Sequence, residues 1–299
     1  MNILVTGGNG FIGTNLCIVL LKQGHKVTSL DLNDSIFTHK NLRTILGDVE
    51  TFTTTESYDQ IYHLACPASP PRYQLNPIKT LTTNFNGTLN MLNIANKSNS
   101  RLLFTSTSEI YGDPLISPQT EDYKGNVNTQ GPRACYDEGK RVAETLCYDH
   151  SRMYGTNTCI ARLFNTYGPY MDIDDGRVVS NFINQCIDGE PLIIYGGTQT
   201  RSFCYVDDTV DGIIKLMNSN LHETINIGNP TCEITIEEFA YVIKHLMKSN
   251  VVVKHGPKQE DDPMQRKPDI AKAIRMLNWK PITSLDDGLI KTINYFGSI

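Results

Sequence analysis

Asn2-Ile-Leu-Val-Thr-Gly-Gly-Asn-Gly-Phe-Ile-Gly13 opens the chain and decides how its first half folds. A short apolar run leads into a turn with four glycines, at positions 7, 8, 10 and 13, and an amphipathic stretch follows the turn. Strand, glycine turn and helix in this order predict a dinucleotide-binding unit. Gly7 permits the tight turn, Gly10 lets the backbone approach a pyrophosphate, and Gly13 lets helix and strand pack closely.

The end of the next predicted strand carries an acid. This strand covers His25–Leu30 and leads into Asp31. A carboxylate at this position accepts hydrogen bonds from the adenosine ribose hydroxyls and repels a 2′-phosphate. The sequence therefore predicts NAD, rather than NADP, as the cofactor.

Strands and helices alternate through the first half of the chain. Further strands are predicted before Gly47, over Tyr58–Ala65 and over Arg101–Thr107, with a helix over Asn76–Asn96. This alternation predicts a parallel, doubly wound sheet, so we expect an α/β, Rossmann-type domain. Asp48, after the third strand, is either a contact to the adenine amine or part of a plain turn.

Composition excludes several classes of function. The chain has 299 residues, a hydrophobic fraction of 39%, a charged fraction of 20% and a formal charge of −5. This charge, with no run of Lys and Arg, argues against nucleic-acid binding. The eight cysteines show no C-x-x-C spacing, so no metal site and no disulfide framework is expected. Without an N-terminal targeting pattern, the expected location is cytoplasmic.

The candidate catalytic stretch is Gly131-Pro-Arg-Ala-Cys-Tyr-Asp-Glu-Gly-Lys-Arg141. Tyr136 and Lys140 stand four residues apart, so a helix places both on one face. A lysine ammonium near a phenol favours the phenolate, which can take a proton from a sugar hydroxyl. Thr107 and Glu109 follow the fifth strand, where catalytic groups of doubly wound sheets gather.

Together these motifs resemble the extended short-chain dehydrogenase/reductase family that acts on nucleotide sugars. Longer stretches resemble, within that family, the decarboxylases of UDP-glucuronate. They are His63–Tyr73, Ser106–Asp113, Pro132–Glu144, Asp175–Phe182 and Arg266–Ile270.

The resemblance implies a set of binding residues. For NAD it implies the glycine turn with Phe11 and Ile12, then Asp31, Asp48, Val49, Leu64, Ala65, Thr105, Ser106, Tyr136 and Lys140. For UDP-glucuronate it implies Tyr73, Asn165, Arg177, Tyr195, Arg201 and Arg266. Asn165, Arg177 and Arg201 would follow the diphosphate, Tyr195 the uracil and Arg266 the uronic carboxylate; each arginine is otherwise a surface cation.

The resemblance also implies a reaction. Tyr136, assisted by Lys140 and Thr107, takes the proton of the 4-hydroxyl while hydride leaves C4 for NAD. The resulting 4-keto acid loses CO2, C5 is protonated, and hydride returns to C4 to give UDP-xylose. Glu109 would lie near C5 and handle a proton or orient the sugar.

The resemblance divides the chain into two parts. Residues 1–164 are expected to form the NAD-binding domain. A smaller mixed α/β lobe that binds the sugar nucleotide covers 165–299, with about 200–218 returning to the main sheet. A homodimer is expected through a bundle of the Asn76–Asn96 and Pro132–Tyr154 helices.

Other functions remain open on the sequence alone. A 4,6-dehydratase usually has Asp-Glu after the threonine, but Ser108 stands where the acid would be. A 4-epimerase needs only the threonine and tyrosine, and has no use for Glu109 or Arg266. A non-catalytic, redox-sensing NAD-binding protein would not need the intact Tyr136 and Lys140.

Overall fold

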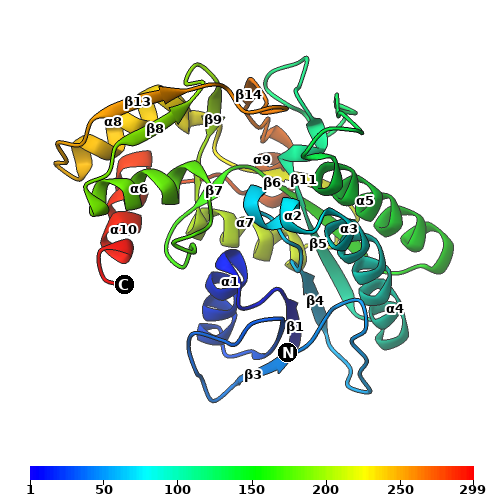
Figure 1. Cartoon of the computed structure of the whole chain (residues 1–299). Helices are drawn as coiled ribbons and strands as arrows, with labels where there is room; N and C mark the ends of the chain where they lie inside the picture. Colours follow the sequence, from blue (N-terminus) through cyan, green and yellow to red (C-terminus); the bar gives the residue numbers. More distant parts are fainter.

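A seven-stranded parallel sheet runs through the computed structural model of the chain, which describes residues 1–299 (Figure 1). The strand order is β11-β6-β5-β4-β1-β2-β3. The strands are β1 (Asn2–Thr6), β2 (Lys26–Asp31), β3 (Leu42–Leu46), β4 (Gln60–His63), β5 (Arg101–Thr107), β6 (Thr158–Leu163) and β11 (Thr224–Ile227). The order reverses between β1 and β4, which confirms the doubly wound Rossmann-type fold.

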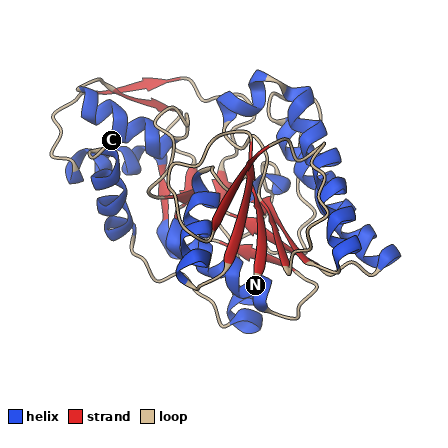
Figure 2. Ribbon diagram, turned by 90° about the horizontal axis from the view of Figure 1, so that it is seen from below, coloured by secondary structure: helices blue, strands red, loops and turns tan.

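Helices cover both faces of this sheet (Figure 2). On one face lie α1 (Phe11–Lys22), α7 (Val206–Asn218) and α9 (Ala271–Leu277). The other face carries α3 (Pro77–Thr82), α4 (Thr88–Ser98) and the long α5 (Ala134–Tyr154), while the short α2 (Pro70–Leu75) contacts α3 and α5. Apolar side chains of both helical layers pack on the buried strands.

The helix predicted over Asn76–Asn96 contains an irregularity. It forms α3 and α4 joined by a π segment, η1 (Thr83–Gly87). In that segment Asn84 Nδ2 donates hydrogen bonds to the Thr80 carbonyl, at 2.9 Å, and to Cys66 Sγ, at 3.0 Å. Such π segments often occur beside functional sites, and Cys66 lies in the loop after β4.

The second lobe is built from short strands and three helices. The helices are α6 (Val178–Asp188), α8 (Ile236–Leu246) and α10 (Leu285–Phe296). The strand groups are β8 (Leu192–Tyr195) with β13 (Val253–Gly256), β7 (Thr166–Tyr167) with β10 (Cys204–Tyr205), and β9 (Thr200–Ser202) between β12 (Glu233–Thr235) and β14 (Gln265–Arg266). The chain also forms two 3₁₀ turns: η2 (Ser108–Tyr111), directly after β5, and η3 (Pro230–Cys232), between β11 and β12.

The structure draws the boundary between the two parts differently from the sequence prediction. The chain returns to the main domain through α7, which packs on the main sheet, and through β11, which pairs with β6. Thr200–Ser202, expected to return to the main sheet, instead pairs with β12 and β14. Both edges of β9 are thereby occupied, so it has no free edge for the main sheet.

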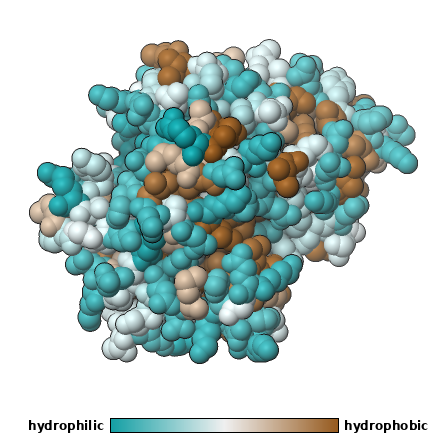
Figure 3. Space-filling view, turned by 180° about the vertical axis from the view of Figure 1, so that it is seen from behind, coloured by the Kyte–Doolittle hydropathy of each residue, from teal (hydrophilic) through white to brown (hydrophobic).

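The surface is largely polar. Figure 3 shows that the rear face is mainly hydrophilic and carries its apolar side chains in a few patches. None of the helices combines the length and the apolar character needed to cross a lipid bilayer.

Gly13 fixes how closely α1 approaches the glycine turn. A Cβ atom at Gly13 would lie 2.0 Å from the Gly7 carbonyl oxygen. We therefore expect Gly13→Ala to lower the free energy of unfolding by about 1–3 kcal/mol and to weaken NAD binding, as measured by thermal denaturation and calorimetry. Gly297→Ala is the control, because its Cβ would lie 3.5 Å from the nearest atom in a helical backbone. Equal effects of the two substitutions would contradict this account.

Candidate functional site

The glycine turn and Asp31 meet at the carboxyl ends of β1 and β2. Gly7 has φ +69°, which strains any residue with a side chain. Asp31 Oδ2 accepts a hydrogen bond from the Asn9 amide at 3.0 Å, and Oδ1 accepts one from the Asn33 amide at 3.1 Å. The carboxylate therefore stands beside the turn, as a ribose contact requires.

Asp48 and Val49 lie next to the helix that α3, η1 and α4 form together. Lys79 Nζ donates to Asp48 Oδ2 at 2.6 Å. Burial raises the pKa of Asp48, but the hydrogen bond from Lys79, the hydrogen bond from the Glu50 amide and the charge of Lys79 together lower it by more, so the pKa is lowered. Val49 is buried against Gly87 of the π segment. The adenine contact of Asp48 stays a prediction.

The segments after β4 and within β5 form the floor between the glycine turn and the catalytic helix. Backbone atoms of Ala65, which follows Leu64, lie 2.9 Å from where a Gly7 side chain would begin. Thr105 Oγ1 donates to the His63 carbonyl at 3.1 Å, and Ser106 Oγ is buried without a partner. These residues fit the close approach of a flat cofactor.

Tyr136 occupies the first turn of α5. It is buried, and its ring stacks on that of Tyr73, with centroids 5.1 Å apart and planes within 9°. Burial raises the pKa of Tyr136, while a hydrogen bond with the Thr107 hydroxyl and the charge of Arg177 lower it in part. Thr107 thus acts on the phenol of Tyr136, and the catalytic role of the two residues stays a prediction.

Lys140 lies one turn further along the helix. Its Nζ donates to the Thr105 carbonyl at 2.9 Å and lies 5.9 Å from the centre of the Tyr136 ring. Burial lowers the pKa of Lys140. Lys140 thus lies on the same helix as Tyr136 and close to its ring, and its role in lowering the Tyr136 pKa stays a prediction.

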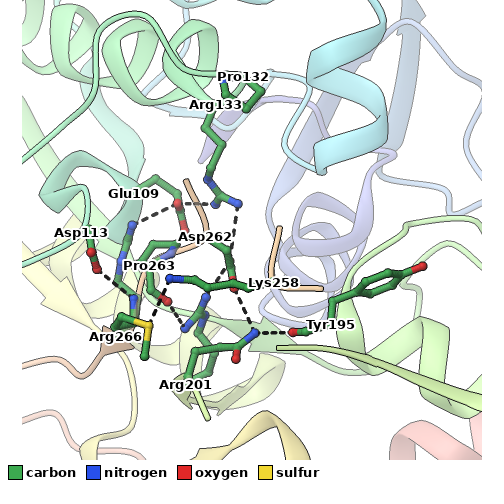
Figure 4. A network of polar contacts seen from close by, with 12 residues as sticks. Glu109, Asp113, Pro132, Arg133, Tyr195, Arg201, Lys258, Asp262, Pro263 and Arg266 are labelled. Atoms are coloured by element: carbon green, nitrogen blue, oxygen red, sulfur yellow. Dashed lines mark hydrogen bonds and ion pairs between the residues drawn. The ribbon is translucent and has the colours of Figure 1, made fainter. Parts of the chain in front are cut away.

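Glu109 joins the two lobes through arginines (Figure 4). Its Oε2 accepts hydrogen bonds from Arg133 Nη2 at 2.5 Å and from Arg266 Nη2 at 3.1 Å. Arg266 is fully buried, so it is not the surface cation that the sequence left open. Its Nε and Nη1 have no partner in the protein, which leaves two buried donors for a ligand.

Arg201 stands beside Arg266 because β9 and β14 pair in parallel with these two residues in register. Arg201 Nη2 donates to Asp262 Oδ1 at 2.7 Å, and its Nη1 donates to the Pro263 carbonyl at 2.9 Å. Asp262 also lies 3.8 Å from Arg133. Arg201 is therefore buried in an ion pair, close to the Glu109 cluster.

The remaining predicted sugar-nucleotide residues are spread around this cluster. Arg177 forms a two-point ion pair with Asp175, and its guanidinium lies 5.9 Å from the centre of the Phe11 ring. Asn165 Oδ1 is buried without a partner. Tyr195 is 43% exposed, and Figure 4 shows its ring pointing away from the arginines.

Three charged residues of this region were not singled out from the sequence: Arg133, Asp137 and Asp262. Arg133 and Asp137 stand three residues before and one after Tyr136, and Asp262 precedes Arg266 by four. Arg133 and Asp137 are charged residues inside a motif quoted for the resemblance, which was the available signal, whereas Asp262 lies just before one. Their roles depend on contacts with other segments, which spacing does not give.

Comparison with known proteins identifies the family of the chain. The model of the NAD dependent epimerase/dehydratase family matches residues 3–228. The chain belongs to this family.

Within the epimerase/dehydratase family, curated relatives cover nearly the whole chain. UDP-glucuronic acid decarboxylase 1 of Danio rerio is 52% identical, over 98% of this chain and 72% of its own length. UDP-glucuronic acid decarboxylase 6 of Arabidopsis thaliana is 53% identical, over 97% of this chain and 87% of its own length.

Solved structures of other family members share the fold. A UDP-glucose 4-epimerase from Thermotoga maritima with UDP-glucose superposes with a TM-score of 0.93 at 28% identity, over 100% of this chain and 99% of its own. A UDP-glucuronic acid 4-epimerase from Bacillus cereus, in complex with UDP-glucuronic acid and NAD, gives 0.89 at 26% identity, with the same coverage. The glycine turn, Asp31 and the unpartnered Ser106 hydroxyl fit the family's NAD.

Asp31 should decide the choice between cofactors. We expect the chain to bind NAD at least tenfold more tightly than NADP, because the carboxylate repels the 2′-phosphate. Asp31→Asn should narrow this ratio, chiefly by improving NADP binding. Titration calorimetry measures both ratios, with Asp34→Asn as the control on the same loop. Equal affinities of the unaltered protein for the two cofactors would rule out this role of Asp31.

Proposed function

We propose that this chain converts UDP-glucuronate into UDP-xylose and CO2. The observation that carries the proposal is the fully buried Arg266 beside Glu109, with two donor nitrogens left for an anion. The decarboxylases named above, about half identical to this chain along nearly its whole length, support the same reaction.

Oxidation at C4 uses Tyr136 and Thr107. NAD, which the glycine turn and Asp31 would hold, would supply a hydride acceptor for C4 and the hydride that later returns there, so the reaction would have no net redox change. Tyr136 takes the proton of the 4-hydroxyl as the C4 ketone forms. The Thr107 hydroxyl, which acts to lower the Tyr136 pKa, would keep the phenol aimed at that oxygen. Lys140, bound to the Thr105 carbonyl, ties the helix to the end of β5.

Loss of CO2 follows from the position of the ketone. The carboxylate is β to the C4 ketone, so the electrons of the breaking C5–C6 bond move into an enolate on O4. Donors at O4, which we assign to Tyr136 and Thr107, stabilise that charge. Arg266 binds the carboxylate and positions the sugar, while Glu109 neutralises part of the positive charge of Arg266. This sharing matters, because a cation that held the carboxylate too tightly would oppose its departure.

The neighbouring reactions of the family fit the site less well. Ser108 is a buried hydroxyl and cannot act as the acid of a 4,6-dehydratase. A 4-epimerase shares the fold, but its chemistry requires no C5–C6 cleavage and no proton for C5. The arginines and carboxylates grouped around Glu109 favour decarboxylation.

The decisive experiment supplies UDP-glucuronate to the NAD-bound protein and measures CO2 and UDP-xylose. Arg266→Ala should lower UDP-xylose formation by about 10²-fold or more while NAD affinity stays unchanged, because Arg266 acts at the carboxylate. Tyr136→Phe should stop the reaction before hydride transfer. Arg275→Ala, outside the site on α9, is the control for loss of a cation. Near-normal turnover by Arg266→Ala would remove Arg266 from the site.

We also propose a homodimer formed through α3–α4 and α5. Ile78 and Phe85, seven residues apart on one face of the π-bulged helix, are 68% and 42% exposed. Tyr148 on α5 is 68% exposed. Large apolar side chains on two packed helices suit a four-helix bundle with the same helices of a second copy.

Light scattering tests the dimer. We expect two chains per particle at micromolar concentration, and a monomer after Ile78→Glu with Phe85→Glu, because charges there would be buried at the interface. Leu115→Glu, at an exposed leucine outside these helices, should leave the dimer intact. A monomeric unaltered protein would refute the proposal.

A further inference from the structure

The proposed decarboxylation consumes a proton. When C5–C6 breaks, CO2 leaves without the electron pair, and C5 must then gain a proton before hydride can return to C4. Tyr136 is engaged at O4 and cannot serve C5 at the same time. The site therefore needs a second acid, which water recharges in every turnover.

Glu109 alone is a poor store for that proton. Burial would raise the pKa of Glu109, but the positive charges of Arg133 and Arg266 outweigh it and hold the pKa at about 2. Glu109 is consequently a carboxylate at neutral pH, with Oε2 accepting from both guanidinium groups.

Asp137 differs from Glu109 although it lies in the same cluster. It is 6% exposed, in the first turn of α5 directly after Tyr136. Its Oδ1 is buried without a hydrogen-bond partner, and its carboxyl forms no ion pair in the structure. A buried carboxyl with no such partner is stable only when it carries its proton.

The groups around Asp137 come from four segments. The groups whose charges act on Asp137 are Glu109 on η2, Arg133 just before α5, Arg266 on β14, and Tyr73 on α2, with Glu138 and Cys135 on its own helix. Arg133 links Asp137 to Glu109, because the Asp137 amide donates to the Arg133 carbonyl at 3.1 Å and the Arg133 guanidinium pairs with Glu109. Burial and then the negative charge of Glu109 raise the pKa of Asp137 to about 8, against the opposing charges of Arg133 and Arg266. Neighbouring carboxyls with pKa values pushed this far apart hold one proton between them.

We propose that Asp137 stores the proton that C5 receives, and that it passes this proton on through Glu109. The proposal rests on the function proposed above. As the enolate collapses, the Asp137 carboxyl gives its proton to the Glu109 carboxylate, and Glu109 gives that proton to C5. Asp137 is left as a carboxylate and recovers its proton from water. One proton is consumed for each CO2 released, which balances the reaction.

The kinetic test uses NAD-bound protein with UDP-glucuronate and the variant Asp137→Asn. We expect UDP-xylose formation to slow by about 10²-fold. CO2 release should still occur once per site, and NADH absorbance should build up, because hydride cannot return until C5 is protonated. The fall in kcat as pH rises through about 8, expected for the unaltered protein, should vanish in the variant.

Asp149→Asn is the matched control, because this carboxylate lies further along the same helix and pairs with Arg152, and it should keep both the rate and the pH profile. Asp137→Glu keeps a titratable group, so kcat of this variant should still fall as pH rises, but at a different pH from that of the unaltered protein. This second variant decides the matter if Asp137→Asn fails to bind NAD.

A stability measurement tests the stored proton without activity. A carboxyl whose pKa is raised by folding stabilises the fold below its unfolded value of about 4, and that stability is lost as pH rises through about 8. The Tm of Asp137→Asn should therefore rise relative to that of the unaltered protein between these pH values.

The two proposals fail in different ways. If the unaltered protein releases no CO2 from UDP-glucuronate, the proposed function is wrong. If it does, but Asp137→Asn keeps the rate, the basic limb and a parallel Tm profile, then Asp137 stores no proton and only this inference falls.

Discussion

The hydrogen bond between Arg266 and Glu109 holds the two halves of the site together. Arg266 belongs to the small sheet of the second lobe, and Glu109 follows the central strand β5. A fully buried guanidinium is costly unless a carboxylate and further acceptors compensate for lost water. Glu109 compensates in part, and the Nε and Nη1 donors of Arg266 have no partner in the protein. The charges of Arg133 and Arg266 together keep Glu109 ionised, and the Glu109 charge in turn raises the pKa of Asp137.

Much of the main domain follows from local sequence patterns. The β1–glycine–α1 unit and the Tyr136–Lys140 spacing were predicted because each depends on a few consecutive residues and on regular geometry. The pairing of β9 with β14 has no such local signal. Two-residue strands from distant segments are in register only because the lobe packs them together, so their placement required the structure.

Side-chain electrostatics were harder to predict than side-chain identity. The positions of Tyr136 and Lys140 on one helical face were clear, yet the pKa of Tyr136 depends on its burial under Tyr73. Arg133 and Asp137 lie within the motif that was recognised. What they do depends on Glu109 and Arg266, which reach them from other elements.

The register of β9 and β14 separates two tasks within the chain. In the reaction proposed above, hydride and proton transfer at C4 would use groups of the central sheet and α5, whereas the arginines proposed to bind the sugar acid lie on short strands of the outer lobe. Replacing one residue of such a strand leaves the glycine turn and the Tyr136 helix untouched. Relatives with this fold can therefore diverge in the sugar they accept through changes in the lobe, while the oxidoreductase half is inherited unaltered.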